Sequence, residues 1–411
     1  MQHLLFNKLK KAFIVLFLCI VVTAITGCWD RKEVNDLAVV TAIGIDKKDD
    51  KNIELSIQIF NPRSVGGSGQ MDGSGGGSGG GSGGGSDQVL IQSEVGLTLA
   101  DAMSKFQEKL ARQIFWGHDE TYIISQELAK EGIREQMDFL LEDPDLRENG
   151  NVYISSGKAK DILPLQPTLE RNSSEMLREL SAFRIGMIVT ISDLAQMLAG
   201  ETGAAAIPLI AISQSSGNST NSSPIPSLMG TAVLKADKMI GHLSDKTTRG
   251  VLWFRNEIDS VTVTVRPKLA EQGMISVRLK KNKTQLIPTI QEGKWTITLR
   301  SESKGEIVQN TTNLNMMNPE FVKELEKEVG IEIQKRMELS LKQVQKKLKA
   351  DILGFAQAFH QKYPKEWNEV KDHWDQKFPE IEVVITPKVR IQRSGLSNSG
   401  AIRPKQEVKN K

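Results

Sequence analysis

Cysteine and histidine are scarce in this sequence, and their scarcity limits the chemistry that the protein can perform. The 411 residues include two cysteines, Cys19 and Cys28, and five histidines. Cys19 lies in an apolar run near the N-terminus, so removal of that run would leave Cys28 alone and exclude an intramolecular disulfide. His360 and His373 lie thirteen residues apart and lack the paired spacing of a metal site. We therefore expect no metal and no cofactor.

Long apolar runs are missing too, with one exception at the N-terminus. Residues 12–26, AFIVLFLCIVVTAIT, follow the basic segment at 8–11. As a helix this run would be roughly 22 Å long, which is shorter than the ~30 Å core of a bilayer. A basic segment followed by a short apolar one is typical of a secretory signal peptide. A marginal membrane anchor is the alternative, because residues 4–6 could lengthen the run.

An excess of positive charge is missing once this signal is removed. The formal net charge of +3 comes from Lys8, Lys10 and Lys11, and without them 50 basic and 50 acidic residues remain. A general nucleic-acid binder should carry a clustered basic excess. We therefore expect no nucleic-acid partner.

Motifs of the common enzyme classes are missing as well: there is no nucleophile elbow, P-loop or dinucleotide fingerprint. The most suggestive group is His118-Asp119-Glu120. Adjacent residues of a strand point in different directions and rarely converge on one metal ion. We interpret the group as the polar start of a strand and expect no catalytic residues.

The remaining cysteine lies where the apolar run ends. Ile25-Thr26-Gly27-Cys28 resembles a bacterial lipobox, with an aliphatic residue and two small residues before the cysteine. Small residues let the backbone enter a peptidase site, and the thiol accepts diacylglycerol. An unmodified cysteine in an export signal is the alternative. Each buried CH₂ contributes about 0.8 kcal/mol, so two or three acyl chains would hold the protein on a membrane. We predict S-diacylglycerol and N-acyl groups on Cys28 as the only membrane attachment.

Strand-like and helix-like segments alternate in the first half of the mature chain. Residues 36–46 and 52–60 are expected to form a hairpin, and residues 87–95 a third strand. Between them, residues 66–86 are nearly all Gly and Ser, which is typical both of an engineered linker and of a natural low-complexity loop. Because a third strand follows, we interpret this tract as a long loop within one domain rather than a boundary. Thr98 is expected to cap a helix, with Asp101 as its partner.

The second half is β-rich and ends in a long helix. Residues 260–300 contain segments that alternate apolar and polar side chains, which predicts a sheet with one buried and one solvated face. From Asn318-Pro319 to about residue 361, apolar residues recur every three or four positions, as in one amphipathic helix or two in line, broken near Gly330 or Gly354. We expect this helix to lie across the preceding sheet; a coiled coil or partner-binding helix is the alternative.

These patterns predict an α+β protein of three mixed α/β domains, with largely antiparallel sheets and a long C-terminal amphipathic helix packed on the last sheet. The expected division is a lipoprotein-type signal peptide at 1–27, an N-terminal domain at 28–165 with a Gly/Ser loop at 66–86, a middle domain at 166–249 with a Ser/Asn/Pro loop at 213–227, a C-terminal domain at 250–395 and a disordered tail at 396–411.

Several stretches resemble one known family. They are GCWDRKEVNDLAVVTAIGID (27–46), HDETYIISQELAKEGI (118–133), EDPDLREN (142–149), GTAVLKADKMIGHLSDKTTRGVLWF (230–254) and YPKEWNEVKDHW (363–374). In this order they resemble the Ger(x)C spore-germination lipoproteins, the C subunits of nutrient germinant receptors. The resemblance covers essentially the whole mature chain, and Cys28 matches the lipidated cysteine of the family.

The resemblance implies a lipid-anchored, non-enzymatic subunit on the outer face of the spore inner membrane. It would work with the integral-membrane A and B subunits of the receptor and be needed to initiate germination in response to small nutrients. Two alternatives belong to other classes. One is a solute-binding lipoprotein that itself binds the germinant; the other is a lipoprotein hydrolase acting on cell-wall material.

Overall fold

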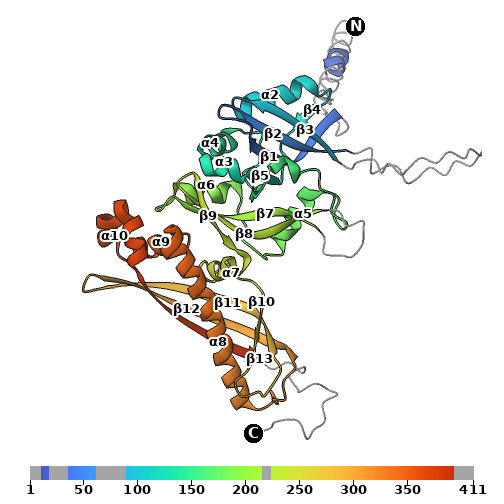
Figure 1. The fold of residues 1–411 in the computed structure, drawn as a ribbon. Coiled ribbons are helices and arrows are strands. Elements are labelled where there is room, and N and C mark those ends of the chain that lie inside the picture. Colours follow the sequence, from blue (N-terminus) through green and yellow to red (C-terminus); the bar gives the residue numbers. More distant parts are fainter. Residues whose placement is uncertain (1–10, 18–35, 62–88, 215–223, 393–411) are drawn as a thin grey trace, which may run out of the picture.

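The computed structural model describes residues 11–17, 36–61, 89–214 and 224–392, which form two β-sheets with their covering helices (Figure 1). Cys28, the Gly/Ser tract at 66–86 and the tail at 396–411 lie outside the described residues. None of the helices in the described ranges is long and apolar enough to span a membrane.

The first sheet has nine strands within the described ranges. Its inner pairs, from β1 through β5 and β6 to β7, are parallel, and its outer pairs are antiparallel. In spatial order the strands are β3 (Val89–Gly96), β2 (Ile53–Phe60), β1 (Leu37–Lys47), β5 (Thr121–Ser125), β6 (Asn151–Ser155), β7 (Ala204–Ser213), β8 (Ile225–Lys235) and β9 (Lys238–Ser244), and β4 (Gln113–Phe115) pairs with β1. Parallel strands need cover on both faces, which agrees with their nearly continuous apolar sequences.

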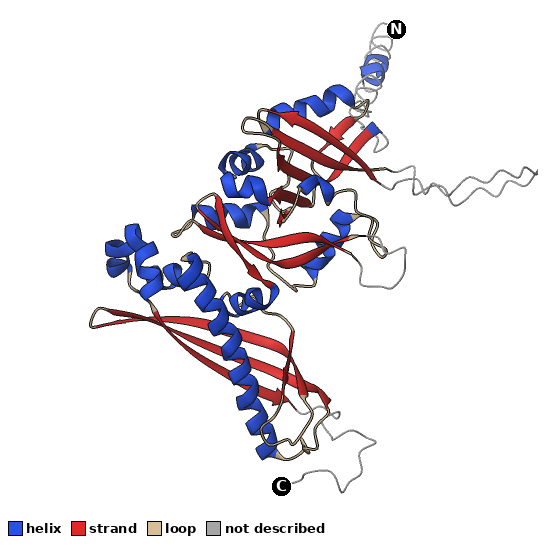
Figure 2. Ribbon diagram, viewed as in Figure 1, coloured by secondary structure: helices blue, strands red, loops and turns tan. Residues whose placement is uncertain are grey.

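Helices cover both faces of this sheet, as Figure 2 shows. Apolar contacts bury one face beneath α2 (Leu99–Lys109), α3 (Gln126–Glu131), α4 (Arg134–Glu142) and α6 (Ile191–Ala199). The other face carries a smaller cluster beneath α5 (Ser173–Ala182) and the 3₁₀ turn η3 (Ala159–Asp161). The predicted cap of α2 is present, because Oγ1 of Thr98 accepts a hydrogen bond from the Asp101 N–H at 3.2 Å.

The third strand lies in the sheet where the sequence predicted it. Phe60, the last residue of β2, pairs with Val89, the first residue of β3. The two ends of the Gly/Ser-containing segment therefore meet as antiparallel neighbours in one sheet. The boundary expected near residue 165 falls between β6 and β7, which pair with each other at Ile154 and Leu209. The division into domains at 165 and 249 stays a prediction.

The second sheet has the order β10 (Val261–Val265), β11 (Ile275–Gln291), β12 (Lys294–Asn310) and β13 (Glu382–Gln392). The first three strands are antiparallel, and β13 runs parallel to β12. Within the alternating region at 260–300, residues 275–291 form one continuous strand, β11. A bulge between Leu279 and Lys281 shifts the alternation, so the apolar pattern is interrupted while the strand continues.

The long C-terminal helix lies across this second sheet, which confirms the predicted packing (Figure 1). It comprises α8 (Pro319–Leu341), a π-helical turn η4 (Lys342–Leu348) and, after a break, α9 (Phe355–Lys362). The break coincides with positive φ angles at Lys349 and Gly354, whereas Gly330 lies buried inside α8. Four short elements follow: α10 (Pro364–Val370), the 3₁₀ turn η5 (Lys371–His373), α11 (Trp374–Lys377) and the 3₁₀ turn η6 (Phe378–Glu380).

Helix α7 (Asp245–Phe254) joins the two sheets and packs against α8 at a small residue. A Cβ placed on Gly250 would lie 2.0 Å from Oγ of Ser340 and 2.6 Å from the carbonyl oxygen of Arg336. The Ser340 hydroxyl lies 2.7 Å from the Thr247 carbonyl oxygen, so a hydrogen bond crosses the same contact. Glycine at position 250 therefore allows the two helices to approach closely.

Replacement of Gly250 by alanine is expected to lower the free energy of unfolding by about 1–3 kcal/mol, because the added methyl group overlaps α8. In a helix, alanine is more stable than glycine by roughly 1 kcal/mol. A lower free energy of unfolding in Gly250→Ala would therefore have to come from the clash. Urea unfolding of Gly250→Ala measures it. Gly157→Ala is the control, since nothing lies within 4 Å of a Cβ there. Equal stability of the two variants would contradict the close approach.

Candidate functional site

A hollow of about 550 Å³ lies at the end of the first sheet where β1 begins. We call it the β1 hollow. It opens beside the N-terminal end of the described globular part, which starts at Asp36. Its apolar wall comes from the strands and its polar wall from α5 and the turn before β5: Leu37, Val39, Phe60, Phe115, His118 and Arg178 are among its lining residues.

Helix α5 is held in place by side chains that bond to backbone. Asn172 caps the helix by accepting a hydrogen bond from the Glu175 N–H at 2.9 Å. The Ser174 hydroxyl donates to the Thr41 carbonyl of β1 at 2.8 Å. This docking brings Arg178 to the hollow, where Nη1 lies 2.9 Å from Oε2 of Glu120.

The three residues His118, Asp119 and Glu120 reach three different environments. His118 is exposed at the β1 hollow, Asp119 is buried beneath it, and Glu120 pairs with Arg178. They precede β5 rather than forming its first residues. Within the described ranges, no group of three or more His, Cys, Asp or Glu side chains is arranged to hold a metal ion.

Asp119 is a buried carboxyl group with one main partner. The Tyr122 hydroxyl donates a hydrogen bond to Oδ2, while Oδ1 is buried without a hydrogen-bond partner among the described residues. Burial disfavours the charged form and raises the pKa of Asp119 to about 7. Burial also raises the pKa of Tyr122, so its hydroxyl remains a donor.

This pKa predicts a pH-dependent stability. Between about pH 4 and pH 7 the folded chain holds a proton on Asp119 that the unfolded chain has released, so stability falls as pH rises through this window. Urea unfolding at pH 5 and pH 8 should show that Asp119→Asn removes on the order of 1–3 kcal/mol of this fall.

Asp138→Asn is the matched control, because it makes the same substitution at an exposed position on α4. An unchanged dependence in Asp119→Asn would show instead that Asp119 is charged in the folded protein at pH 5.

A second hollow, the junction hollow, has a volume of about 610 Å³ and lies where the C-terminal helices meet the first sheet. Two pairs of polar side chains lie in it. Nδ1 of His360 lies 2.7 Å from Oε1 of Glu201, and Nε of Arg255 lies 2.8 Å from Oε1 of Glu257. The Trp367 indole donates to the second oxygen of Glu201 at 3.3 Å, so Glu201 links the turn before β7 to α9 and α10.

Asp351 lies beside the junction hollow and organises the start of α9. Its carboxylate accepts hydrogen bonds from the four N–H groups of residues 353–356, at 2.7–3.2 Å, and from the Trp374 indole at 3.1 Å. Burial raises the pKa of Asp351, and these donors act in the opposite direction. Asp351 was not expected from the sequence, although an Asp three positions before Gly354 at a helix start is a capping signal.

These two hollows differ in what they offer. The β1 hollow has an apolar wall beside an arginine, and its Ser174 hydroxyl is engaged with the backbone. The junction hollow has internally paired charges.

Arg178 and Glu201 were not expected from the sequence, because their partners are remote along the chain. Cys28, the predicted lipidation site, lies outside the described residues, so its lipidation stays a prediction.

Comparison with known proteins identifies the class. Two family descriptions match in order: "Spore germination protein N-terminal domain" at residues 30–212 and "Spore germination B3/ GerAC like, C-terminal" at residues 229–395. The crystal structure of the GerBC protein has the same fold, with a TM-score of 0.56, 17% identity, and coverage of 85% of this chain and 96% of that chain.

Curated relatives agree with this class. Spore germination protein KC of Bacillus subtilis (strain 168) is 27% identical over 410 residues, covering 95% of this chain and 97% of its own length. Spore germination protein B3 of the same organism is 23% identical over 393 residues, covering 91% and 95%. The chain therefore belongs to the Ger(x)C family of spore-germination proteins, the C subunits of germinant receptors.

Proposed function

We propose that this chain is the lipid-anchored, non-enzymatic C subunit of a nutrient-sensing germinant receptor, needed to initiate spore germination in response to small nutrients. The observation that carries the proposal is the order and extent of the family match, from residue 30 to residue 395. Cys28 stands two residues before this match begins, at the end of a lipobox-like sequence.

The anchor would place the protein on the outer face of the spore inner membrane, beside the integral-membrane A and B subunits. Seven residues separate Cys28 from Asp36, and a fully extended segment of this length spans at most about 25 Å. The β1 hollow would then lie close to the bilayer and to the membrane subunits. Its apolar wall, with Phe115 44% exposed, suits contact with a partner at this position.

Replacement of Cys28 by alanine tests the anchor. In a strain that depends on this receptor, Cys28→Ala is expected to release the protein from the membrane fraction or trap its precursor, and to abolish nutrient germination. Cys19→Ala, within the apolar run, is the control and should leave both unchanged. Normal germination together with unchanged processing and membrane fractionation of Cys28→Ala would refute the tether.

A second candidate function is direct binding of the germinant by this chain. The junction hollow favours it, because its volume of about 610 Å³ and its charges of both signs suit a small zwitterionic or polar solute.

Calorimetry on residues 29–411 tests this alternative with amino acids and sugars as titrants. If the first proposal is correct, no saturable heat is expected at physiological nutrient concentrations. Saturable binding that is lost in Arg255→Gln would favour the solute-binding function and localise it to the junction hollow.

A further inference from the structure

The second sheet has one covered face and one bare face. On β12 the odd-numbered residues from Trp295 to Ile307 are buried. They lie beneath α8 and the aromatic cluster of the C-terminal helices, which includes Phe359 and Trp374. The even-numbered residues from Lys294 to Val308 are exposed or half-buried, and none of them is buried. We call the surface that these residues share with their neighbours on β10, β11 and β13 the open face.

The open face is strongly basic. The strand register places its charged residues, and all of the cations are exposed. Its central part carries eight cations against two carboxylates, Glu302 and Glu306: the cations are Arg278, Lys280, Lys281, Lys283, Arg300, Lys304, Lys388 and Arg390.

Like charges also stand directly opposite one another on this face. Lys304 on β12 pairs in register with Lys281 on β11 and with Arg390 on β13, so three cations form a row across three strands. Like charges opposite one another destabilise a sheet. Among the described residues in this central part, one ion pair is formed, between Lys280 and Glu306 at 2.6 Å. An anionic partner at this face would therefore relieve the repulsion within the row.

The basic character is local and does not reflect the composition of the chain. Residues 28–228 contain 28 acidic and 17 basic residues, whereas residues 229–411 contain 22 acidic and 33 basic residues. The overall balance of 50 and 50 therefore hides a separation of charge between the two halves. Such a separation indicates that the basic face meets an anionic surface.

We propose that the open face lies on the surface of an anionic phospholipid bilayer, so that the protein lies along the membrane rather than standing on its anchor. The proposal rests on the lipid anchor at Cys28. Basic residues near an anionic bilayer are attracted to it electrostatically, so this face would orient a protein that the acyl chains already hold at the membrane.

Two observations favour a bilayer over an acidic protein. The face is an extended sheet of Lys, Arg and Thr side chains, and the two hollows lie elsewhere, whereas protein hot spots centre on pockets filled by aromatic or arginine anchors. A second copy of this chain could offer its acidic half, but carboxylates there already pair with cations of the same copy, as Glu54 does with Lys160 and Glu94 with Lys109.

Lysine footprinting on the full lipidated chain tests the proposal. The chain is reconstituted in phosphatidylcholine vesicles, with or without about 30% phosphatidylglycerol, and treated with a membrane-impermeant amine reagent. In the anionic vesicles we expect labelling to fall about fivefold or more, as an electrostatic contact would produce, at the lysines of the open face: Lys281, Lys283, Lys304 and Lys388. The internal controls are exposed lysines of α8 and η4, which should not change: Lys323, Lys335 and Lys342.

The protection should disappear in about 0.5 M salt, where the screening length is only about 4 Å. Equal labelling in both kinds of vesicle would overturn the proposal. Protection that grows with the protein-to-lipid ratio, or that persists in neutral vesicles, would overturn it in favour of a second copy. Failure of the anchor can be distinguished from failure of this proposal, because a chain that is not lipidated would not float with neutral vesicles.

Charge reversal supplies the matched variants. Lys281→Glu, Lys283→Glu and Lys304→Glu in one chain should restore the labelling of Lys388 in anionic vesicles to its rate in neutral vesicles. Lys323→Glu, Lys335→Glu and Lys342→Glu change the net charge equally and should leave Lys388 protected. Circular dichroism confirms that both variants fold. The same loss of protection in both would overturn the proposal, because it would reflect net charge rather than the open face.

Discussion

The antiparallel pairing of β7 with β8 is the constraint on which the rest of this structure depends. It runs from Ala204 opposite Lys235 to Ser213 opposite Ile225, and it crosses the gap between the two family regions, 30–212 and 229–395. The C-terminal region thus contributes β8 and β9 to the sheet of the N-terminal region. Two parts that share a ladder of backbone hydrogen bonds cannot rotate about a linker as separate domains do.

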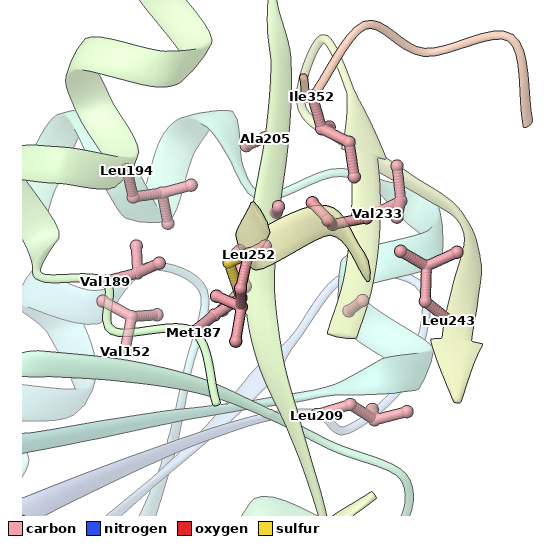
Figure 3. Close-up of a cluster of buried hydrophobic side chains, with 14 of the residues drawn as sticks. Val152, Met187, Val189, Leu194, Ala205, Leu209, Val233, Leu243, Leu252 and Ile352 are labelled. Carbon is pink, nitrogen blue, oxygen red and sulfur yellow. The ribbon is translucent and has the colours of Figure 1, made fainter. Parts of the chain in front are cut away.

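Packing around this ladder extends the connection into the C-terminal part. Figure 3 shows Leu252 of α7 and Ile352, from the segment before α9, among the buried side chains of β7 and β8. Asp351, next to Ile352, holds the first turn of α9 and the Trp374 indole. Because one buried segment contacts both the first core and the aromatic cluster, the second sheet takes a defined position relative to the first.

Local patterns predicted local structure well, and remote pairings escaped them. The Thr98 cap, the hairpin of β1 and β2 and the break at Gly354 depend on neighbouring residues, so the sequence reveals them. The parallel order β1, β5, β6 and β7 depends on contacts between distant segments. Glu120 likewise pairs with Arg178, 58 residues away, which no spacing rule anticipates. The open face was not predicted for a related reason, because a balanced total charge says nothing about where the charges lie.

Because the second sheet has a defined position, the separation of charge can orient the whole protein on a membrane. A lipid anchor followed by seven residues would limit the distance of the protein from the membrane, but would not set its orientation. A basic face on a domain with a flexible linker would not set the orientation either, because that domain could bind the membrane while the rest of the protein turned about the linker. Here the face and the start of β1 belong to one connected body, so a second contact with the bilayer orients the whole molecule. The β1 hollow would then be presented to the membrane subunits in one direction, which a receptor needs if a conformational change is to pass between its subunits.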